Sequence, residues 1–280
     1  MRAVVVDGGR PRLADVRDPG GDGVVRVRAC GLCGSDVEKL AGAPDGLVLG
    51  HEVVGETADG RRIALVHHVP CGDCERCVSG HESTCEGFAA ATIEPGGFAE
   101  LARARAGGVE LPDDVDDVVG SYAEPLACVA RGLERVPVGR VLVVGGGFVG
   151  RLFVALLRRR GDAVSVLDPD PARGDRVVPD GVDAAVICAP GGANEAAAHV
   201  KPAGTILVFA PAGDLTLDPV YRRELTVVGS RSATPRHLEA AVSLLPQLDL
   251  PRAVVFPLDR FEEGLELYRR REAVKVVFTP

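Results

Sequence analysis

The chain has 280 residues, a formal net charge of −8 and a hydrophobic content of 46%. This length is sufficient for two domains, and the acidic balance without tryptophan argues against a nucleic-acid partner. The first residues contain no apolar signal core, and the longest apolar run, 141–157, is interrupted by arginine and glycine. We therefore expect a cytoplasmic protein without a membrane segment.

The first part of the chain, from Val4 to about Leu111, is predicted to be rich in strands. Apolar and charged residues alternate in Val24–Ala29, as in a strand with one buried face, and Val48–Gly55 and Arg62–Val66 have a similar character. Glycine, proline and aspartate separate these runs at short intervals. This pattern favours a compact barrel or sandwich domain.

From Arg140 onward, predicted strands and helices alternate. Helices are expected at Pro125–Val136 and Phe148–Arg160, and a further helix near Arg260–Arg271 precedes a last strand at Lys275–Thr279. The predicted strands between them are Val141–Val144, Val164–Leu167, Ala184–Ile187, Thr205–Phe209 and Leu225–Val228. Such alternation indicates an α/β fold with a doubly wound parallel sheet.

The connection between Asp168 and Asp183 departs from this alternation. A crossover between parallel strands usually contains a helix, but this one contains three prolines and two glycines. We expect little or no helix there, which leaves one face of the sheet thinly covered.

Four cysteines stand close together at positions 71, 74, 77 and 85. Spacings of two, two and seven residues bring Cys71, Cys74, Cys77 and Cys85 together as soft donors for a tetrahedral zinc ion. An iron–sulfur cluster is an alternative, but no proline follows a fourth cysteine at that motif's spacing. A disulfide framework is the other alternative, and cysteines two residues apart pair poorly. The spacing favours structural zinc.

A glycine-rich turn follows the strand at Val141 and opens the next helix. Gly145 permits the tight turn, Gly147 admits a pyrophosphate, and Gly150 allows close packing of helix and strand. Phe148 and Val149 lie between the last two glycines, at the predicted helix N-terminus that would bind phosphates. Asp168 is placed to accept hydrogen bonds from ribose hydroxyls, and its negative charge would repel a 2′-phosphate, so it favours NAD. The nearby Arg173 could counter this preference, so NADP is kept as the alternative cofactor. The alternative is a plain turn with a surface aspartate.

Three short motifs complete an ordered set. They are Cys30-Gly-Leu-Cys33-Gly-Ser35-Asp36, Gly50-His51-Glu52 and Glu124-Pro-Leu. In this order, with the cysteine and glycine motifs, the chain resembles the zinc-containing medium-chain dehydrogenase/reductase family. The similarity is to its polyol and sugar dehydrogenase branch, including microbial glucose dehydrogenases, although this chain is shorter. The resemblance implies a GroES-like β-barrel catalytic domain at 1–122 and 252–280 with a zinc lobe at 68–90, and a Rossmann domain at 123–251.

The resemblance also implies a catalytic zinc ion. Its ligands would be Cys33, His51 and Glu124, the last directly or through water, and Glu52 would enter the coordination sphere during turnover. Asp36 would hold the His51 ring in its ligating tautomer. Ser35 would carry the hydroxyl proton toward solvent. Glu38 stands where many relatives have a histidine, so it would relay protons or bind a sugar hydroxyl, or else be a solvated surface residue.

The resulting hypothesis is an enzyme with two zinc ions per chain and NAD as cofactor, with NADP as the alternative. It would transfer hydride between the cofactor and a secondary alcohol of a polyol, sugar or cyclitol, a small-molecule partner. Reduction of a biosynthetic carbonyl or imine is one alternative, and a non-catalytic nucleotide-binding relative with structural zinc is another. By resemblance we expect a homodimer or homotetramer. Cys30, Cys128 and Cys188 are expected to be core residues.

Overall fold

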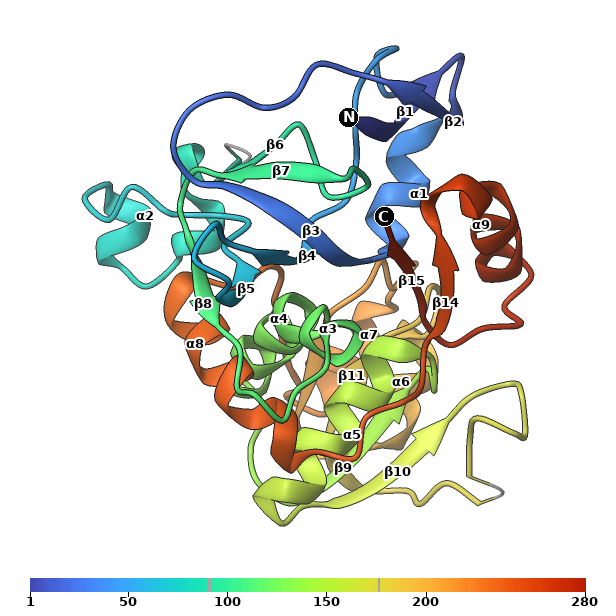
Figure 1. Cartoon of the computed structure of the whole chain (residues 1–280). Coiled ribbons are helices and arrows are strands. Elements are labelled where there is room, and N and C mark those ends of the chain that lie inside the picture. The colour runs from blue at the N-terminus through green and yellow to red at the C-terminus, as the bar shows by residue number, and fades with distance from the viewer. Residues whose placement is uncertain (90–91, 176) are drawn as a thin grey trace. The chain divides into compact units, whose positions relative to one another are not determined.

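A computed structural model describes all residues of the chain except 90, 91 and 176 (Figure 1). The chain divides into two compact units. Unit 1 comprises Met1–Ala127, Ala233–Gln247 and Pro251–Pro280, and unit 2 comprises Cys128–Ser232 and Leu248–Leu250. Ala90, the last residue of the predicted zinc lobe, lies outside the described residues.

Unit 1 is built on a large sheet and a separate hairpin. The hairpin joins β1 (Arg2–Asp7) to β2 (Arg10–Asp15). The large sheet runs in the order β14 (Val254–Pro257), β15 (Val276–Thr279), β3 (Val24–Gly31), β4 (Glu52–Glu56), β5 (Arg62–Leu65) and β8 (Gly108–Glu110), with β7 (Leu101–Ala104) on β3 and β6 (Ile93–Glu94) on β7. Gly31 lies opposite Glu52 on one side and Val277 on the other. This register brings residues from both ends of the chain to one point.

The helices of unit 1 are short. They are α1 (Gly34–Leu40), α2 (Glu75–Val78), α3 (Asp117–Gly120), α8 (Pro235–Leu244) and α9 (Phe261–Arg269), with 3₁₀ turns at Glu82–Thr84, Glu86–Ala89, Leu245–Gln247 and Leu258–Arg260. Helix α4 (Ala123–Leu133) begins in unit 1 and ends in unit 2. Phe98, Phe261 and Phe278 meet in the core, and the ring centroids of the last two are 4.2 Å apart. They attach α9 to the sheet.

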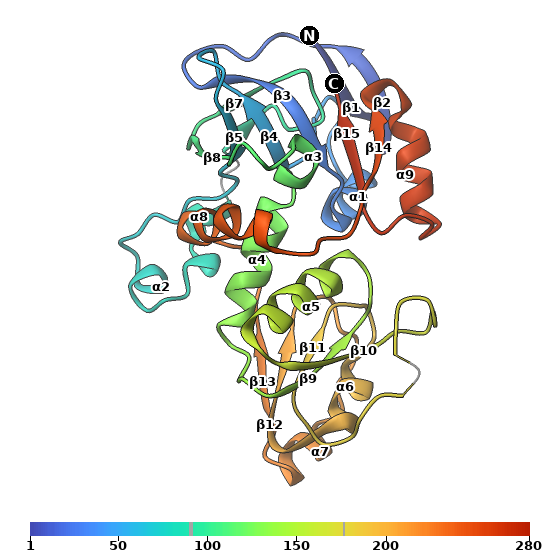
Figure 2. The same ribbon diagram turned by 60° about the horizontal axis from the view of Figure 1, so that its bottom comes forward.

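Unit 2 is a five-stranded parallel sheet with helices (Figure 2). Its strands are β9 (Arg140–Val144), β10 (Ala163–Leu167), β11 (Val182–Ile187), β12 (Val200–Val208) and β13 (Thr226–Gly229), and its helices are α5 (Phe148–Arg160), α6 (Ala193–His199) and α7 (Leu217–Arg222). The order is β10-β9-β11-β12-β13, so the chain reverses direction across the sheet between β10 and β11. Right-handed crossovers then put α5 and α6 on opposite faces, which makes the sheet doubly wound.

The prediction of little or no helix between Asp168 and Asp183 is confirmed for the residues that the structure describes. Between β10 and β11 they contain turns but no helix or strand. The sheet order is that of a six-stranded 3-2-1-4-5-6 sheet from which the third strand is missing. Strand β10 is therefore an edge strand, and none of its five residues is buried.

Some predicted boundaries differ from those in the structure. The strand expected at Val48–Gly55 begins only at Glu52, because Gly50 has a φ of 98° and interrupts the extended chain. Helix α8 was not predicted, and its segment Ala233–Gln247 packs with unit 1 although the sequence assigned 123–251 to one domain. Hydrophobic contacts across the fold decided that placement, and local patterning does not reveal them.

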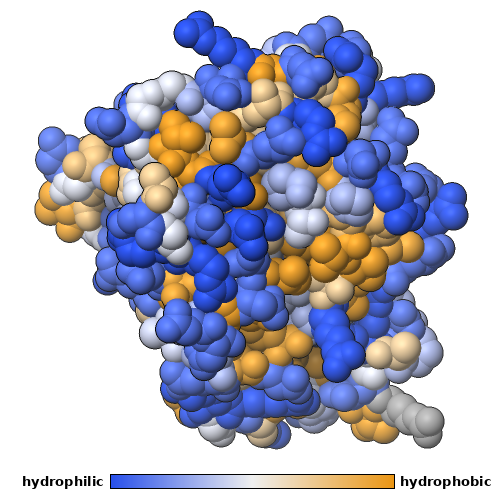
Figure 3. Space-filling view, in the orientation of Figure 1, coloured by the Kyte–Doolittle hydropathy of each residue, from blue (hydrophilic) through white to orange (hydrophobic). Residues whose placement is uncertain are grey.

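The surface carries both hydrophilic and hydrophobic residues, as expected from a chain with 26% charged and 46% hydrophobic residues. Hydrophilic residues are interspersed with hydrophobic ones on the face seen in Figure 3. In the described part of the chain, every helix is too short or too polar to cross a bilayer.

Candidate active site

The four-cysteine lobe has the geometry of a zinc site. The sulfur of Cys71 lies 3.5 Å from that of Cys85 and 3.9 Å from that of Cys77, and the sulfurs of Cys77 and Cys74 are 3.5 Å apart. Four thiolates around zinc at about 2.3 Å are about 3.8 Å from one another. The backbone N–H of Cys71 donates to Cys85 Sγ and lowers the pKa of that thiol to about 6. The four cysteines therefore fit a tetrahedral zinc ion.

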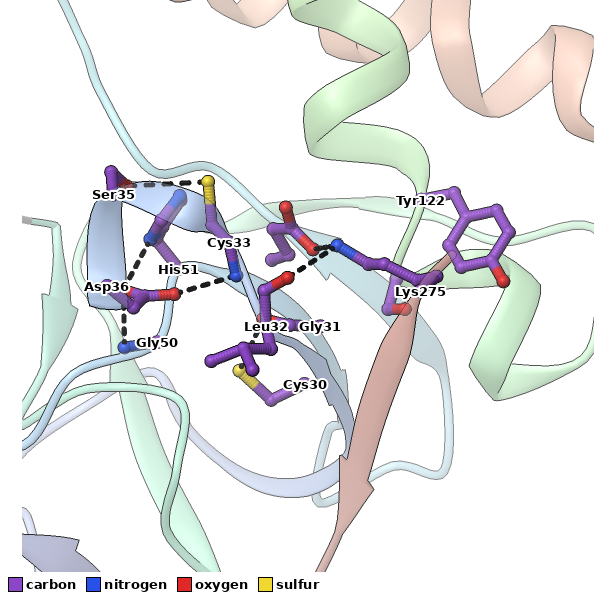
Figure 4. Close-up of polar contacts among 12 residues, drawn as sticks. Cys30, Gly31, Leu32, Cys33, Ser35, Asp36, Gly50, His51, Tyr122 and Lys275 are labelled. Carbon is purple, nitrogen blue, oxygen red and sulfur yellow. Dashed lines mark hydrogen bonds and ion pairs between the residues drawn. The ribbon is translucent and has the colours of Figure 1, made fainter. Parts of the chain in front are cut away.

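A second cluster is organised by the first turn of α1. Cys33 caps this helix, and its backbone N–H donates to Asp36 Oδ2 at 3.1 Å. The Ser35 hydroxyl donates to Cys33 Sγ at 3.4 Å (Figure 4). The same local turn therefore places a thiol, a hydroxyl and a carboxylate side by side.

Asp36 connects this helix to His51, which precedes β4. Its Oδ1 lies 3.2 Å from His51 Nδ1 and also accepts from the backbone N–H of Gly50 at 3.4 Å. Burial opposes charge on both side chains. Their mutual attraction outweighs it, lowers the pKa of Asp36 and raises the pKa of His51 well above 6.5. With Nδ1 bonded to a carboxylate, His51 keeps Nε2 for a metal.

Glu52 is held by a buried lysine that sequence reasoning missed. Lys275 Nζ donates to Glu52 Oε2 and, at 3.1 Å, to the carbonyl oxygen of Leu32 (Figure 4). Both charged side chains are only 2% exposed. A lysine within an apolar C-terminal strand was the signal available in the sequence, because an isolated buried charge is rarely tolerated.

Cys33, His51 and Glu52 form a compact donor set. Their potential ligand atoms all lie within 4.8 Å of one another. A thiolate, an imidazole and a carboxylate suit zinc, so these residues fit the predicted catalytic ion. Glu124, at the start of α4, is not part of this set, although its charge contributes to the raised pKa of His51. Glu38 is exposed on α1.

A second residue that the sequence did not single out is His67, which follows β5. Its ring stacks on that of His51 with centroids 4.7 Å apart and an interplanar angle of 28°. Burial, together with repulsion from neighbouring histidines, lowers the pKa of His67 to about 2. His67 is therefore a neutral imidazole beside the donor set. Two adjacent histidines after a strand were the sequence signal.

The glycine turn of unit 2 has the backbone that a dinucleotide needs. Gly145 has a φ of 103°, and Gly147 caps α5, whose first N–H groups at Phe148 and Val149 have no acceptor within the helix. A Cβ at Gly150 would overlap the carbonyl oxygen of Gly145, whereas a Cβ at Gly147 would meet no atom within 4 Å. The turn therefore packs tightly at Gly150 and faces open space at Gly147, which fits a pyrophosphate.

Asp168 and Arg173 lie beside this turn, in a different arrangement from the expected one. Asp168 Oδ2 accepts from the backbone N–H of Gly146 at 2.7 Å, and its Oδ1 accepts from that of Asp170 at 2.9 Å. The guanidinium of Arg173 pairs with Asp170 at 3.3 Å. The carboxylate is thus fixed at the edge of the glycine turn, with oxygen lone pairs that remain available to ribose hydroxyls.

Of the three other cysteines, all expected to be core residues, Cys30 is buried, whereas Cys128 and Cys188 are only partly buried. Cys30 is buried beneath the backbone of Gly50 and Gly97, and burial raises the pKa of its thiol. Cys188, which follows β11, also has its pKa raised by burial. Cys128 is half-buried on α4.

Comparisons with known proteins agree with this architecture. The alcohol dehydrogenase GroES-like domain family matches residues 19–113. D-altritol 5-dehydrogenase of Agrobacterium fabrum is 32% identical, and the alignment covers 86% of each chain. L-galactonate-5-dehydrogenase of Escherichia coli is 26% identical over 92% of each chain.

A solved structure extends the likeness to the whole fold. It is described as a zinc-binding dehydrogenase from Sinorhizobium meliloti bound to NADP, and it is 27% identical with a TM-score of 0.81. The match covers 100% of this chain and 99% of that one. The predicted α/β class, with a GroES-like domain and a Rossmann-type parallel sheet, is confirmed. The chain therefore belongs to the zinc-containing medium-chain dehydrogenase/reductase family and is an NAD(P)-dependent dehydrogenase.

Proposed function

We propose that the protein oxidises a secondary alcohol of a polyol, sugar or cyclitol and transfers its hydride to NAD. The observation that carries this proposal is that Cys33 and His51 present their ligand atoms within 4.8 Å of each other, with Asp36 orienting the imidazole. The relatives named for altritol and galactonate support a polyhydroxylated substrate.

Cys33 and His51 would hold the catalytic zinc ion, and Glu124 would be the third ligand, directly or through a water molecule. Bound zinc would supply a Lewis acid that lowers the pKa of the substrate hydroxyl. Asp36 keeps the proton of His51 on Nδ1 and so presents Nε2 as a neutral ligand. Glu52 is paired with Lys275, so Glu124 would be the carboxylate that binds the zinc ion. Glu52 would bind it only when the ion pair with Lys275 opens.

Two side chains of α1 are candidates for moving the hydroxyl proton. Ser35 hydrogen-bonds the Cys33 sulfur and would receive the proton near the metal. Glu38 is exposed, so it would pass the proton to solvent or bind a sugar hydroxyl. Transfer of the hydroxyl proton through these groups would allow the substrate to form the alkoxide from which hydride leaves.

NAD is the proposed cofactor because Asp168 is held at the turn where a 2′-phosphate would meet its negative charge. Arg173 is engaged by Asp170, which limits its use for a phosphate. We further propose two zinc ions per chain, a homodimer or homotetramer, and a cytoplasmic location, where the cysteines of the two donor sets would stay reduced.

The test is a screen of NAD and NADP reduction over polyols, hexoses, inositols and simple alcohols, with the zinc content measured in parallel. We expect two zinc ions per chain and the highest turnover with a polyhydroxylated alcohol and NAD. Cys33→Ser and His51→Ala should abolish turnover and leave NAD affinity within about twofold, because the glycine turn proposed to bind the pyrophosphate does not include them. Normal turnover in either variant would refute the zinc mechanism, and higher efficiency with NADP would refute the cofactor assignment.

A further inference from the structure

His67 has no part in the chemistry proposed above. This residue lies immediately beyond the donor set, because its ring stacks on His51 with centroids 4.7 Å apart. His68 follows it, with a centroid separation of 3.7 Å. Asp36 occupies Nδ1 of His51, whereas no carboxylate performs that role for His67 among the described residues.

The Nδ1 atom of His67 is buried, and no described residue gives it a hydrogen bond. Buried polar atoms in native proteins nearly always have a protein, water or ligand partner. A neutral imidazole nitrogen is either a donor or an acceptor, depending on the tautomer. A hydroxyl group pairs with either form, because it both donates and accepts.

A small cavity of unit 1 provides space beside this ring. Its volume is about 20 Å³, and its polar wall consists of His67, His68, Glu124 and Thr234, with apolar side chains around them. A volume of about 10–15 Å³ is enough for one water molecule, so the cavity accommodates one hydroxyl-sized group. The Glu124 carboxylate in its wall disfavours an anionic substituent.

We propose that His67 is a substrate-binding residue that hydrogen-bonds a second hydroxyl group, on the carbon next to the one that is oxidised. The site would thereby select neutral vicinal diols over simple secondary alcohols. This inference rests on the proposed function and adds to it a residue that recognises the substrate. A site built to hydrogen-bond a hydroxyl discriminates strongly against the analogue that lacks it.

Two variants separate the nitrogen from the ring. His67→Phe keeps an aromatic ring against His51 but removes Nδ1, whereas His67→Asn loses the ring and keeps a polar atom near the Nδ1 position. His67→Leu replaces the phenylalanine variant if that variant has a lowered Tm. Each of these variants keeps Cys33 and His51, the residues proposed to hold zinc.

The first measurement compares 2-butanol with 2,3-butanediol, which differ by one vicinal hydroxyl. With the zinc-loaded enzyme and NAD, we expect kcat/KM to favour the diol by about tenfold or more in the wild type. His67→Phe should reduce that ratio to about one, mainly through KM of the diol, and His67→Asn should retain most of it. An equal loss for both alcohols, or an unchanged ratio in His67→Phe, would overturn the assignment.

The second measurement does not require turnover. Calorimetric titration of the two alcohols into zinc-loaded protein should give tighter binding of the diol in the wild type, and no such difference in His67→Phe. If no alcohol is oxidised, the proposed function fails, and this comparison still decides the role of His67. Equal binding of both alcohols by the wild type would show that the cavity holds only a structural water.

Discussion

Lys275 and Glu52 form a buried ion pair that joins the segment before the last strand of the sheet to the start of β4, next to the proposed zinc ligand His51. The lysine lies on the connection into β15, and the glutamate is the first residue of β4, which is 223 positions earlier in the chain. Gly31 of β3 lies between them, and a Cβ there would overlap the Glu52 carboxylate. The absence of a side chain at Gly31 therefore makes the pairing sterically feasible.

Lys275→Met should destabilise the protein by about 3–5 kcal/mol, because it leaves the Glu52 carboxylate buried without a countercharge. Equilibrium urea unfolding of the zinc-loaded protein measures this loss. Adding Glu52→Gln to the lysine variant removes the orphaned charge and should restore part of the stability. Additive effects of the two substitutions would contradict a direct interaction.

Asp36→Asn should weaken zinc binding at Cys33 and His51 by about 10–100-fold, because the amide no longer enforces the ligating tautomer. Competition with a chelator measures the affinity of the weaker of the two zinc ions. Glu38→Gln is the matched control, since it removes a carboxylate from the same helix at an exposed position. An equal loss of zinc affinity in both variants would show that the negative charge of Asp36 matters and that its orientation of the His51 ring does not.

Cys74→Ser should release one zinc ion per chain and lower the Tm, because metal binding at the four-cysteine lobe contributes to folding stability. Metal analysis and differential scanning calorimetry measure both effects. Cys128→Ser provides the control, since that cysteine lies outside both donor sets. Retention of two zinc ions in the Cys74 variant would exclude the proposed ligand set.

Gly147→Ala and Gly150→Ala should separate cofactor binding from folding. The first Cβ meets open space, so we expect an unchanged Tm and at least about tenfold weaker NAD binding, because the methyl group blocks the pyrophosphate. The second Cβ overlaps the carbonyl oxygen of Gly145, so this variant should have a lowered Tm. NAD titration monitored by fluorescence and thermal unfolding are the two measurements. Unchanged NAD affinity in the Gly147 variant would refute the phosphate site.

Local sequence predicted the structure correctly where a single short segment contains all the residues that determine it. Helix α5 runs from Phe148 to Arg160, as predicted, because the glycine cap precedes it and Gly161, with a φ of 93°, ends it. The four cysteines were also recognisable, since their ligand atoms are brought together by a segment of fifteen residues. The resemblance to a known family supplied the role of Asp36, and the structure adds its hydrogen bond to His51.

Relations between distant segments were not readable in the same way. Helix α8 belongs with unit 1 because of packing, and nothing in its own residues distinguishes it from a helix of the parallel sheet. Glu52 and His51 are adjacent in sequence, yet one pairs with Lys275 and the other with Asp36. His51 precedes β4 and Glu52 begins it, and their partners come from different distant segments, which are α1 for His51 and the connection into β15 for Glu52.

The amino-acid sequence by itself determined the order of the motifs, the alternation of strands and helices, and the donor types available to zinc and a dinucleotide. Only the tertiary structure decided that Lys275 neutralises Glu52 and that Asp168 is bonded to the glycine turn. It also decided that His67 stacks on His51 and has a buried nitrogen without a hydrogen-bond partner among the described residues. The physical reason is that donor type and periodicity are local properties of the chain. Burial and charge pairing depend on which distant segments the folded sheet brings into contact.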